Sequence, residues 1–432
     1  MLKRALPVIA LGIAVFGLTA CSTATPGSDA SATSARGQTL SVWIMQGTNP
    51  PETSDTFFAE VNKEFTKETG AKLDIQFVQW ANAHDRFTTA IAGNTTPDVA
   101  ETGSTWTAEF ASAGALAPLT DDIKRAGLEN DLVPGLKASG TYDNQQYGMP
   151  WYAGVRSLVY RSDVFDELGL KTPKTWDDIV ANATKIKASH PEMIPFVVPG
   201  NAEMDVYPWV WGAGGQVATE KNNTWASGLD STKSRTGIQF YTDLATKYGF
   251  STAGATTWKE TDVLDSSVQG KAAMALLGSW TPATITQKAP DLAGKIGATP
   301  IPGPQGGMSP SVLGGSHLSV FSTAKNKGLA WQFVTMMTTG SLAEKWASQT
   351  GYFAGLKSLT KKAEDSKDPV VAAFADQFVN GGASLPVSPQ FGAVQAKQTT
   401  NTMMQSILSG QSSLDQASSS AAREMTDLLN AK

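Results

Sequence analysis

The stretch that decides the fold runs from LSVWIM at residues 40–45 through TSDTFFAEVNKEFTKETG at 53–70 to KLDIQFV at 72–78. The first segment is short and apolar, and the third alternates in the way typical of a half-buried strand. Apolar residues of the middle segment recur at helical spacing, and Gly70 stands where a helix C-cap glycine belongs. The order predicts a strand, a helix and a second strand.

The same alternation continues along the chain. The helix expected at 175–190 begins with Thr175 and Asp178 in the T-x-x-D spacing of a capping box. Alternating strands and helices of this kind predict an α/β fold, with a mainly parallel sheet covered by helices on both faces. Further helices are expected at 84–93, 104–116, 233–248, 327–339, 341–351 and through most of the C-terminal part, and further strands at 97–103, 271–277 and 315–321.

Three stretches interrupt this pattern. YGMPWYAGVRSLVYR (147–161) has no helical stripe, TPIPGPQGGMSP (299–310) is too rich in proline and glycine for a regular element, and GYFAGLKSL begins at Gly351. A chain of 432 residues also exceeds what one hydrophobic core usually supports. We therefore expect two lobes, each discontinuous in sequence, joined by three crossings.

Composition narrows the class of partner. The hydrophobic fraction of 41% and the charged fraction of 17% are those of an ordinary globular protein. A formal net charge of -5 provides no basic field for phosphates, so no nucleic-acid partner is expected. The compositional excess is twelve tryptophans.

The N-terminus carries an export signal. Lys3 and Arg4 precede an apolar run from Ala5 to Leu18, and LTAC ends at Cys21, the only cysteine. LTAC resembles the lipobox of bacterial lipoproteins, which implies a signal peptide over 1–20 and a diacylglycerol on Cys21. The Ser/Thr/Ala/Gly-rich segment up to residue 38 is expected to be a flexible tether. The lipid would hold the domain on the extracellular face of the cytoplasmic membrane.

Catalytic motifs are missing from the sequence. His84, His190 and His317 are far apart and lie in no metal-binding spacing, so a structural role is expected for each. There is no G-x-S-x-G elbow, no G-x-G-x-x-G and no Walker loop. Acidic pairs such as Asp121/Asp122 precede helices, where they favour the helix dipole. We expect neither enzyme activity, nor a cofactor, nor a metal.

What remains is a set of aromatic side chains where the chain is irregular. The flat apolar faces of sugar rings stack on Trp and Tyr, while their hydroxyl groups bind charged and amide side chains. Open α/β sheets bind ligands at strand ends and crossings, which is where these residues fall. The pattern therefore indicates a carbohydrate site.

The ordered set LSVWIMQGTNP, IAGNTTPDVAETGSTWTAEFASAGALAPLTDDI, YGMPWYAGVRSLVYR, TWDD, GKAAMALLGSW and GGSHLSVF resembles the carbohydrate-specific extracellular solute-binding proteins of ABC importers, relatives of the maltose-binding protein. The resemblance covers about residues 38–432. It implies a monomer with the two-lobed periplasmic-binding-protein-like fold, closing over an oligosaccharide and delivering it to membrane permease subunits. Lobe 1 would hold 39–149 and 310–350, and lobe 2 would hold 150–309 and 351–432.

The resemblance also implies which residues bind sugar. Trp280, at the end of GKAAMALLGSW, is expected to stack on the ligand, as is Tyr207 or Trp209 of YPWVWGAGG, while Trp211 is expected in the core. Trp80 and Trp258 stay undecided. The other expected contacts are Gln46, Asn49, Glu101, Trp106, Trp151, Tyr152, Arg156, Gly315 and Ser316.

Alternatives remain open at this point. A surface hydrolase of polysaccharides would need two carboxylates at a defined separation, and no strong pair stands out. A receptor for peptides or phosphorylated polyols would share the fold and differ only in the site. Among sugars, the overall resemblance favours receptors for amino-sugar disaccharides such as chitobiose.

Overall fold

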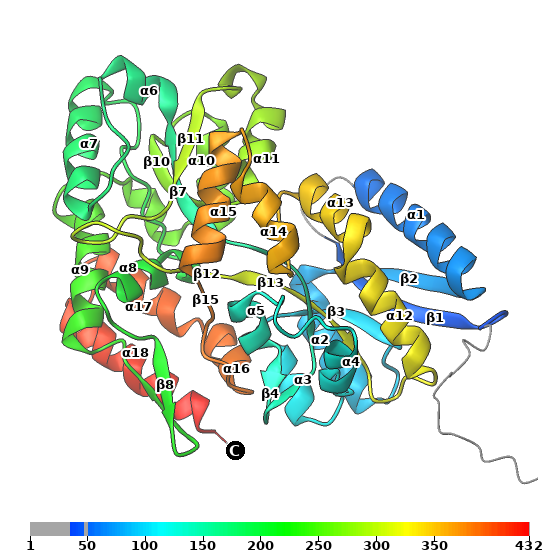
Figure 1. Cartoon of the computed structure of the whole chain (residues 1–432). Coiled ribbons are helices and arrows are strands. Elements are labelled where there is room, and N and C mark those ends of the chain that lie inside the picture. Colours follow the sequence, from blue (N-terminus) through cyan, green and yellow to red (C-terminus); the bar gives the residue numbers. More distant parts are fainter. Residues whose placement is uncertain (1–34, 47–50, 432) are drawn as a thin grey trace, which may run out of the picture.

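The protein is described by a computed structural model that covers residues 35–46 and 51–431 (Figure 1). The expected signal peptide, Cys21 and Asn49 lie outside these residues. Among the helices of the described part, none combines the length and apolar character that a membrane span requires.

The first lobe is the half of the molecule built on a six-stranded sheet, at the right of Figure 1. Its strands stand in the order β14-β6-β13-β3-β1-β2. They are β1 (Thr39–Gln46), β2 (Lys72–Gln79), β3 (Val99–Gly103), β6 (Met149–Gly154), β13 (Gly314–Val320) and β14 (Phe353–Ala354).

Helices cover this sheet as the sequence pattern predicts. The first of them ends at Gly70, whose φ of 76° is left-handed and whose amide donates to the Thr66 carbonyl at 2.9 Å. Glycine adopts this conformation without steric cost, so the C-cap prediction is confirmed. The helices and the small hairpin of this lobe are α1 (Pro51–Thr69), α2 (Trp80–Ala92), α3 (Thr107–Ser112), α4 (Thr120–Arg125), α5 (Pro134–Ser139), α12 (Lys327–Thr338), α13 (Gly340–Thr350), β4 (Thr141–Tyr142) and β5 (Gln145–Gln146).

The second lobe is built on the three-stranded sheet β10-β7-β11, formed by β7 (Arg156–Arg161), β10 (Met274–Gly278) and β11 (Ile296–Thr299). The predicted capping box begins α7, because Thr175 accepts from the Asp178 amide and Asp178 accepts in return. The other elements are α6 (Ser162–Glu167), α7 (Trp176–Ser189), η1 (Glu203–Asp205), α8 (Tyr207–Gly212), β8 (Ala218–Lys221), β9 (Thr224–Ser227), α9 (Thr232–Thr246), η2 (Ala253–Thr257), α10 (Glu260–Val268), α11 (Thr281–Lys288), η3 (Pro290–Leu292), β12 (Ser311–Val312), α14 (Lys357–Glu364), α15 (Pro369–Gly381), β15 (Gly382–Ala383), α16 (Phe391–Ala396), α17 (Thr399–Leu408) and α18 (Leu414–Leu429).

Strand orientation differs from the expectation of mainly parallel sheets. β1 pairs in parallel with β2 and β3, as the strand–helix–strand pattern requires, but β13, β6 and β14 pair antiparallel. Both pairings of β7, with β10 and with β11, are also antiparallel. β7 enters its sheet from the first lobe and β13 enters its sheet from the second lobe, so neither is placed by a βαβ crossover within one sheet.

The chain passes between the sheets at the three irregular stretches. β6 lies in the first sheet and β7, which follows directly, in the second; the chain returns before β13 and leaves again after β14. By sheet membership, β6 to Gly154 and β14 to Ala354 both belong with the first lobe. We therefore propose boundaries a few residues beyond the expected 149 and 350.

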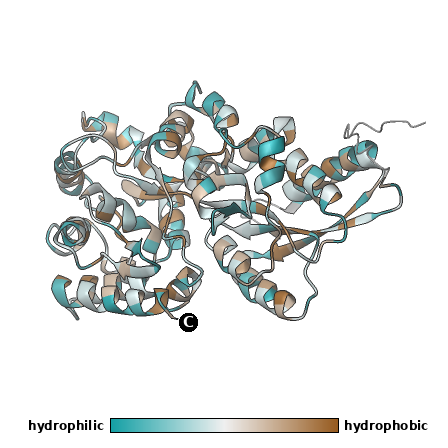
Figure 2. Cartoon of the chain, turned by 60° about the horizontal axis from the view of Figure 1, so that its bottom comes forward, coloured by the Kyte–Doolittle hydropathy of each residue, from teal (hydrophilic) through white to brown (hydrophobic). Residues whose placement is uncertain are grey.

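Each lobe has its own apolar core. One cluster joins β1, α1, α12 and α13, and another joins α7, α8, α9 and α18. Figure 2 shows the apolar residues gathered along the strands of the first lobe, with hydrophilic residues on the outward turns of the helices. A further cluster of buried residues packs across the crossings and joins Leu136, Ala153 and Phe353 of the first lobe to Val159, Leu277 and Phe374 of the second. The crossings are thus the place where the lobes meet and where a ligand can lie.

Candidate functional site

A buried carboxylate on the first lobe lies next to the crossings. Glu101 on β3 accepts from the Met45 amide at 2.8 Å, the Tyr152 hydroxyl at 2.5 Å and the Ser316 hydroxyl at 2.6 Å. Its side chain is fully buried, and burial raises its pKa from 4.5 to about 7, against the lowering effect of those hydrogen bonds. Four strands, β1, β3, β6 and β13, thus contribute to one polar centre.

A buried guanidinium lies where the second lobe begins. Arg156, the first residue of β7, donates from Nε to Glu260 at 3.1 Å, also through Nη2, and lies 3.4 Å from Asp205. Burial alone would lower the pKa of Arg156, but the carboxylates of Glu260 and Asp205 raise it. Both oxygens of Asp205 lack a hydrogen-bond partner among the described residues, and burial raises the pKa of this carboxyl well above its usual range.

Two aromatic rings connect the polar centres. Trp280 lies after β10 and is half-buried; its ring centroid is 5.2 Å from that of Tyr352 and 5.7 Å from the Arg156 guanidinium. Tyr352 in turn lies 4.8 Å from Tyr152, the partner of Glu101. We call Glu101, Tyr152, Arg156, Trp280 and Tyr352 the interlobe cluster. It combines two partly accessible rings, Trp280 and Tyr352, with the buried Tyr152 and two buried charged groups, and rings beside charged groups are what sugar recognition requires.

A second aromatic group lies on the first lobe. The Trp80 ring, at the start of α2, is 37% exposed and lies 5.5 Å from Trp106, which lies 5.4 Å from His84. His84 Nε2 lies 2.9 Å from Glu109, and this hydrogen bond raises the His84 pKa. A structural role was expected for His84, yet the structure places it in a partly exposed aromatic cluster.

The two lobes touch next to that cluster. A Cβ atom on Gly392 of α16 would lie 3.2 Å from Glu109 Oε2 and 3.9 Å from His84 Nε2. Gly392 therefore lets the backbone of the second lobe approach the first closely.

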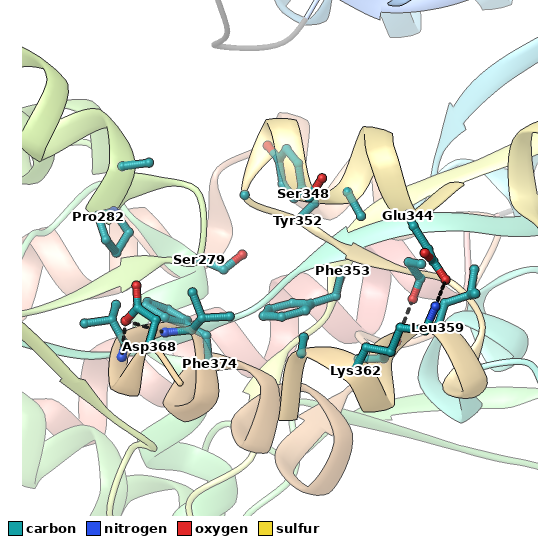
Figure 3. A pocket seen from close by; sticks show the side chains of 18 of the residues that line it. Ser279, Pro282, Glu344, Ser348, Tyr352, Phe353, Leu359, Lys362, Asp368 and Phe374 are labelled. Carbon is teal, nitrogen blue, oxygen red and sulfur yellow. Dashed lines mark hydrogen bonds and ion pairs between the residues drawn. The ribbon is translucent and has the colours of Figure 1, made fainter. Parts of the chain in front are cut away.

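A groove of about 1070 Å³ adjoins the interlobe cluster (Figure 3). Ser279 and Tyr352 line its inner end, and its walls are α11, α13, α14 and α15. Figure 3 shows Tyr352 and Ser348 on one side of the groove, with Asp368 and Phe374 on the opposite side. It is thus walled by elements of both lobes.

Three expected contact residues lie in cores instead. Trp151 is 1% exposed and stacks on Trp346 at 5.5 Å. Tyr207 and Trp209 are completely buried; the Tyr207 hydroxyl lies 3.0 Å from Thr400, and Trp209 stacks on Tyr241 at 5.2 Å. Their backbone lies near the crossings, but their side chains point inward, so we correct these three to core residues.

Trp209 was expected at the site and Trp211 in the core, but Trp209 is the completely buried ring, while Trp211 packs half-buried against the same core. YPWVWG forms the helix α8, in which residues two apart point about 200° away from each other. Trp209 faces the core, and Trp211 is half-buried and lines a shallow pocket with Trp225.

The remaining expected residues are placed near the lobe boundary. Gln46 is half-buried at the end of β1, and its Nε2 has no hydrogen-bond partner among the described residues. Gly315 lies on β13, where a Cβ would come within 2.3 Å of the Tyr152 carbonyl oxygen, so only glycine fits. Ser316 bonds Glu101 as described above.

Sequence reasoning missed three residues of these clusters, Asp205, Glu260 and Tyr352, and left Trp80 undecided. Asp205 and Glu260 gave no local signal, because their proximity to Arg156 arises only in the fold. Tyr352 stands in the third irregular stretch, GYFAG, and could have been found by the same argument as Trp280. Trp80 directly follows β2, where a strand-end argument would have favoured it.

No metal centre emerges from the part of the chain that the structure describes, in which no three His, Cys, Asp or Glu side chains are grouped suitably. The cluster chemistry is that of hydrogen bonding and stacking.

Known proteins resemble this chain over most of its length. The family model described as bacterial extracellular solute-binding protein matches residues 49–339. The diacetylchitobiose binding protein DasA of Streptomyces coelicolor is 27% identical over 424 residues, which cover 96% of each chain. A solved solute-binding protein of an ABC transporter from Thermotoga lettingae, bound with α-D-tagatose, has a TM-score of 0.77 and 27% identity and covers 91% of this chain and 100% of that one. The sugar-binding protein MalE of Xanthomonas citri has the same fold, with a TM-score of 0.80 at 23% identity, covering 91% of this chain and 97% of its own.

Proposed function

Because the chain belongs to the family of bacterial extracellular solute-binding proteins, we propose that it captures a di- or oligosaccharide between its lobes and delivers it to the permease of an ABC importer. Proteins of this family bind solutes and are not enzymes, so the alternative of a polysaccharide hydrolase is set aside. The receptor acts as a monomer that switches between open and closed lobes, with ligand contacts to both lobes favouring the closed form.

The observation that carries this proposal is the interlobe cluster. Trp280 and Tyr352 offer ring faces to the C–H surface of a sugar. The Arg156 guanidinium packs against the Trp280 ring, and Glu101 bonds Tyr152, which packs against Tyr352. Hydrogen bonds to charged groups are stronger than neutral ones, and a fixed geometry is what selects one hydroxyl pattern over another. Trp106 and Gln46 add a ring and an amide from the first lobe.

The ligand class follows from charge and from the relatives. Arg156 is already engaged by two carboxylates, Glu260 and Asp205, so it is not available to a phosphate. This favours a neutral sugar over a phosphorylated polyol. The relation to a diacetylchitobiose binding protein supports an amino-sugar disaccharide as the first candidate.

The LTAC sequence supports lipid anchoring. A diacylglycerol on Cys21 and a flexible tether up to residue 38 would keep the receptor at the extracellular face of the cytoplasmic membrane, within reach of its permease.

The test is a titration of a soluble chain beginning at Gly37 with di- and trisaccharides of the chitin, maltose and cellulose series. Binding is followed by tryptophan fluorescence and confirmed by calorimetry. Saturable binding of one series without product formation is expected. Failure of every sugar, together with binding of a peptide or a phosphorylated polyol, would contradict the proposal.

A further inference from the structure

We propose that the groove between α11, α13 and α15 is an extended subsite, which binds the further sugar units of an oligosaccharide whose first two units lie on the interlobe cluster. The inference rests on the proposed function and adds a preference for ligands longer than a disaccharide. The groove is separate from the residues that the sequence singled out, apart from its closeness to Trp280.

Size is the first argument. Ligand pockets commonly measure about 300–1000 Å³. The groove alone has about 1070 Å³, although Trp280, Arg156 and Glu101 do not line it. A disaccharide bound at the interlobe cluster would leave this volume to solvent, whereas a longer chain would fill it.

Continuity is the second argument. Tyr352 lines the groove and also packs against Trp280, so one ring belongs to both sites. The Ser279 hydroxyl, at the same junction, is buried and has no hydrogen-bond partner among the described residues. A Cβ on Gly351 would lie 2.9 Å from the Trp280 Cα, which shows how close the groove wall comes to that residue. A sugar chain leaving Trp280 therefore meets a polar atom and then the groove.

The lining gives the chemical class. Its four charged side chains are all engaged: Lys362 with Glu344, Lys345 with Glu60, and Asp368 with the Val370 amide at the start of α15. The rest combines apolar surface, such as Phe353, with hydroxyl groups. The hydroxyl-bearing residues are Ser279, Thr286, Ser341, Ser348, Tyr352 and Thr360. A neutral chain with apolar ring faces and hydroxyl edges suits such a lining, and an ionised ligand does not.

Two exposed positions allow the groove to be filled without disturbing a core. Ser348 on α13 and Ala283 on α11 line the groove from opposite lobes, and both are exposed. Gln349 and Gln287 are exposed neighbours on the same helices and lie outside the lining. Ser348→Trp and Ala283→Trp are therefore the filling variants, and Gln349→Trp and Gln287→Trp are their matched controls.

The experiment measures, by calorimetry, the Kd of di-, tri- and tetrasaccharides from the series that binds in the titration above. Wild type is expected to bind the tetrasaccharide about tenfold more tightly than the disaccharide. Both filling variants should lose this gain and keep the disaccharide Kd within about threefold, while the controls should behave as wild type.

Equal Kd values for all lengths in wild type would overturn the inference and leave the proposed function intact. An increase in affinity with sugar length that persists in both filling variants would also overturn the inference. So would an increase in affinity for an alkyl or aryl glycoside that the filling variants abolish, if the longer sugars show no such increase. Lack of binding by any sugar would instead refute the proposed function on which it rests.

Discussion

Two groups of large rings lie within the same protein and differ in what surrounds them. Trp209 is enclosed by Trp176, Phe240 and Tyr241 and has no exposed surface. Trp280 contacts one ring, Tyr352, and one cation, Arg156, and keeps part of its surface exposed. The first group stabilises a lobe, while the second is free to exchange water for a ligand. An aromatic residue beside a glycine-rich turn therefore says little about its role until its neighbours are known.

The largest expected effect separates the groups by stability. Trp209→Ala should lower the free energy of unfolding by about 3–5 kcal/mol, because it removes a buried ring and leaves a cavity. Trp211→Ala, the matched change on the half-buried side of α8, should cost about 1 kcal/mol. Urea denaturation of the soluble chain measures both. If the Trp209→Ala protein were as stable as wild type, Trp209 would not be a stabilising core residue and the contrast with Trp280 would fail.

The next effect concerns pH and belongs to the interlobe cluster. The Glu101 carboxyl has a folded-state pKa of about 7 against 4.5 when exposed, so the folded state binds the proton more tightly. Its contribution to stability is fully present below pH 4.5 and is lost as pH rises through 7. The stability of wild type relative to Glu101→Gln should thus fall by about 3 kcal/mol between pH 4.5 and pH 8.

Denaturation at a series of pH values measures this difference. Glu64→Gln, at an exposed position on α1, is the control and should show a difference from wild type that changes little with pH. A constant difference for Glu101→Gln across the range would show that Glu101 does not titrate there.

The smallest expected effect is on affinity. Trp280→Ala should weaken sugar binding about thirtyfold, which corresponds to about 2 kcal/mol, because a stacking surface at the centre of the site is lost. Its effect on stability should be smaller than that of Trp209→Ala. Trp258→Ala, at a half-buried position of the second lobe, is the control and should leave the Kd unchanged. If wild type and Trp280→Ala bind the sugar with equal affinity, Trp280 does not contact the ligand.

Prediction from sequence succeeded where the signal is local. The helix expected at 53–70, the C-cap at Gly70 and the capping box at Thr175 follow from spacing and from backbone preference, and the structure confirms them, with the helix beginning two residues earlier, at Pro51. The α/β class and the sites of crossing follow from the same periodicity and its interruptions. The expectation of mainly parallel sheets was wrong for the pairings of β7 and β13, because each of these strands enters its sheet from the other lobe.

The candidate site was only partly accessible to sequence. Glu101, Arg156 and Trp280 were expected at the site from the family resemblance, and in the structure a chain of contacts through Tyr152 and Tyr352 joins them. Asp205 and Glu260 escaped notice, since each lies far along the chain from Arg156. Whether Trp209 or Trp211 faces inward depended on α8 being a helix and on which face of it meets the core.

The sequence by itself determined the α/β class, many of the helices and strands and the division into two lobes, because these depend on periodicity and composition over short windows. Only the tertiary structure decided which rings are core and which are accessible, which charges meet Arg156, and that a groove opens beside Tyr352. Burial and ionic contact depend on residues distant in sequence, and no local pattern specifies how those segments pack together.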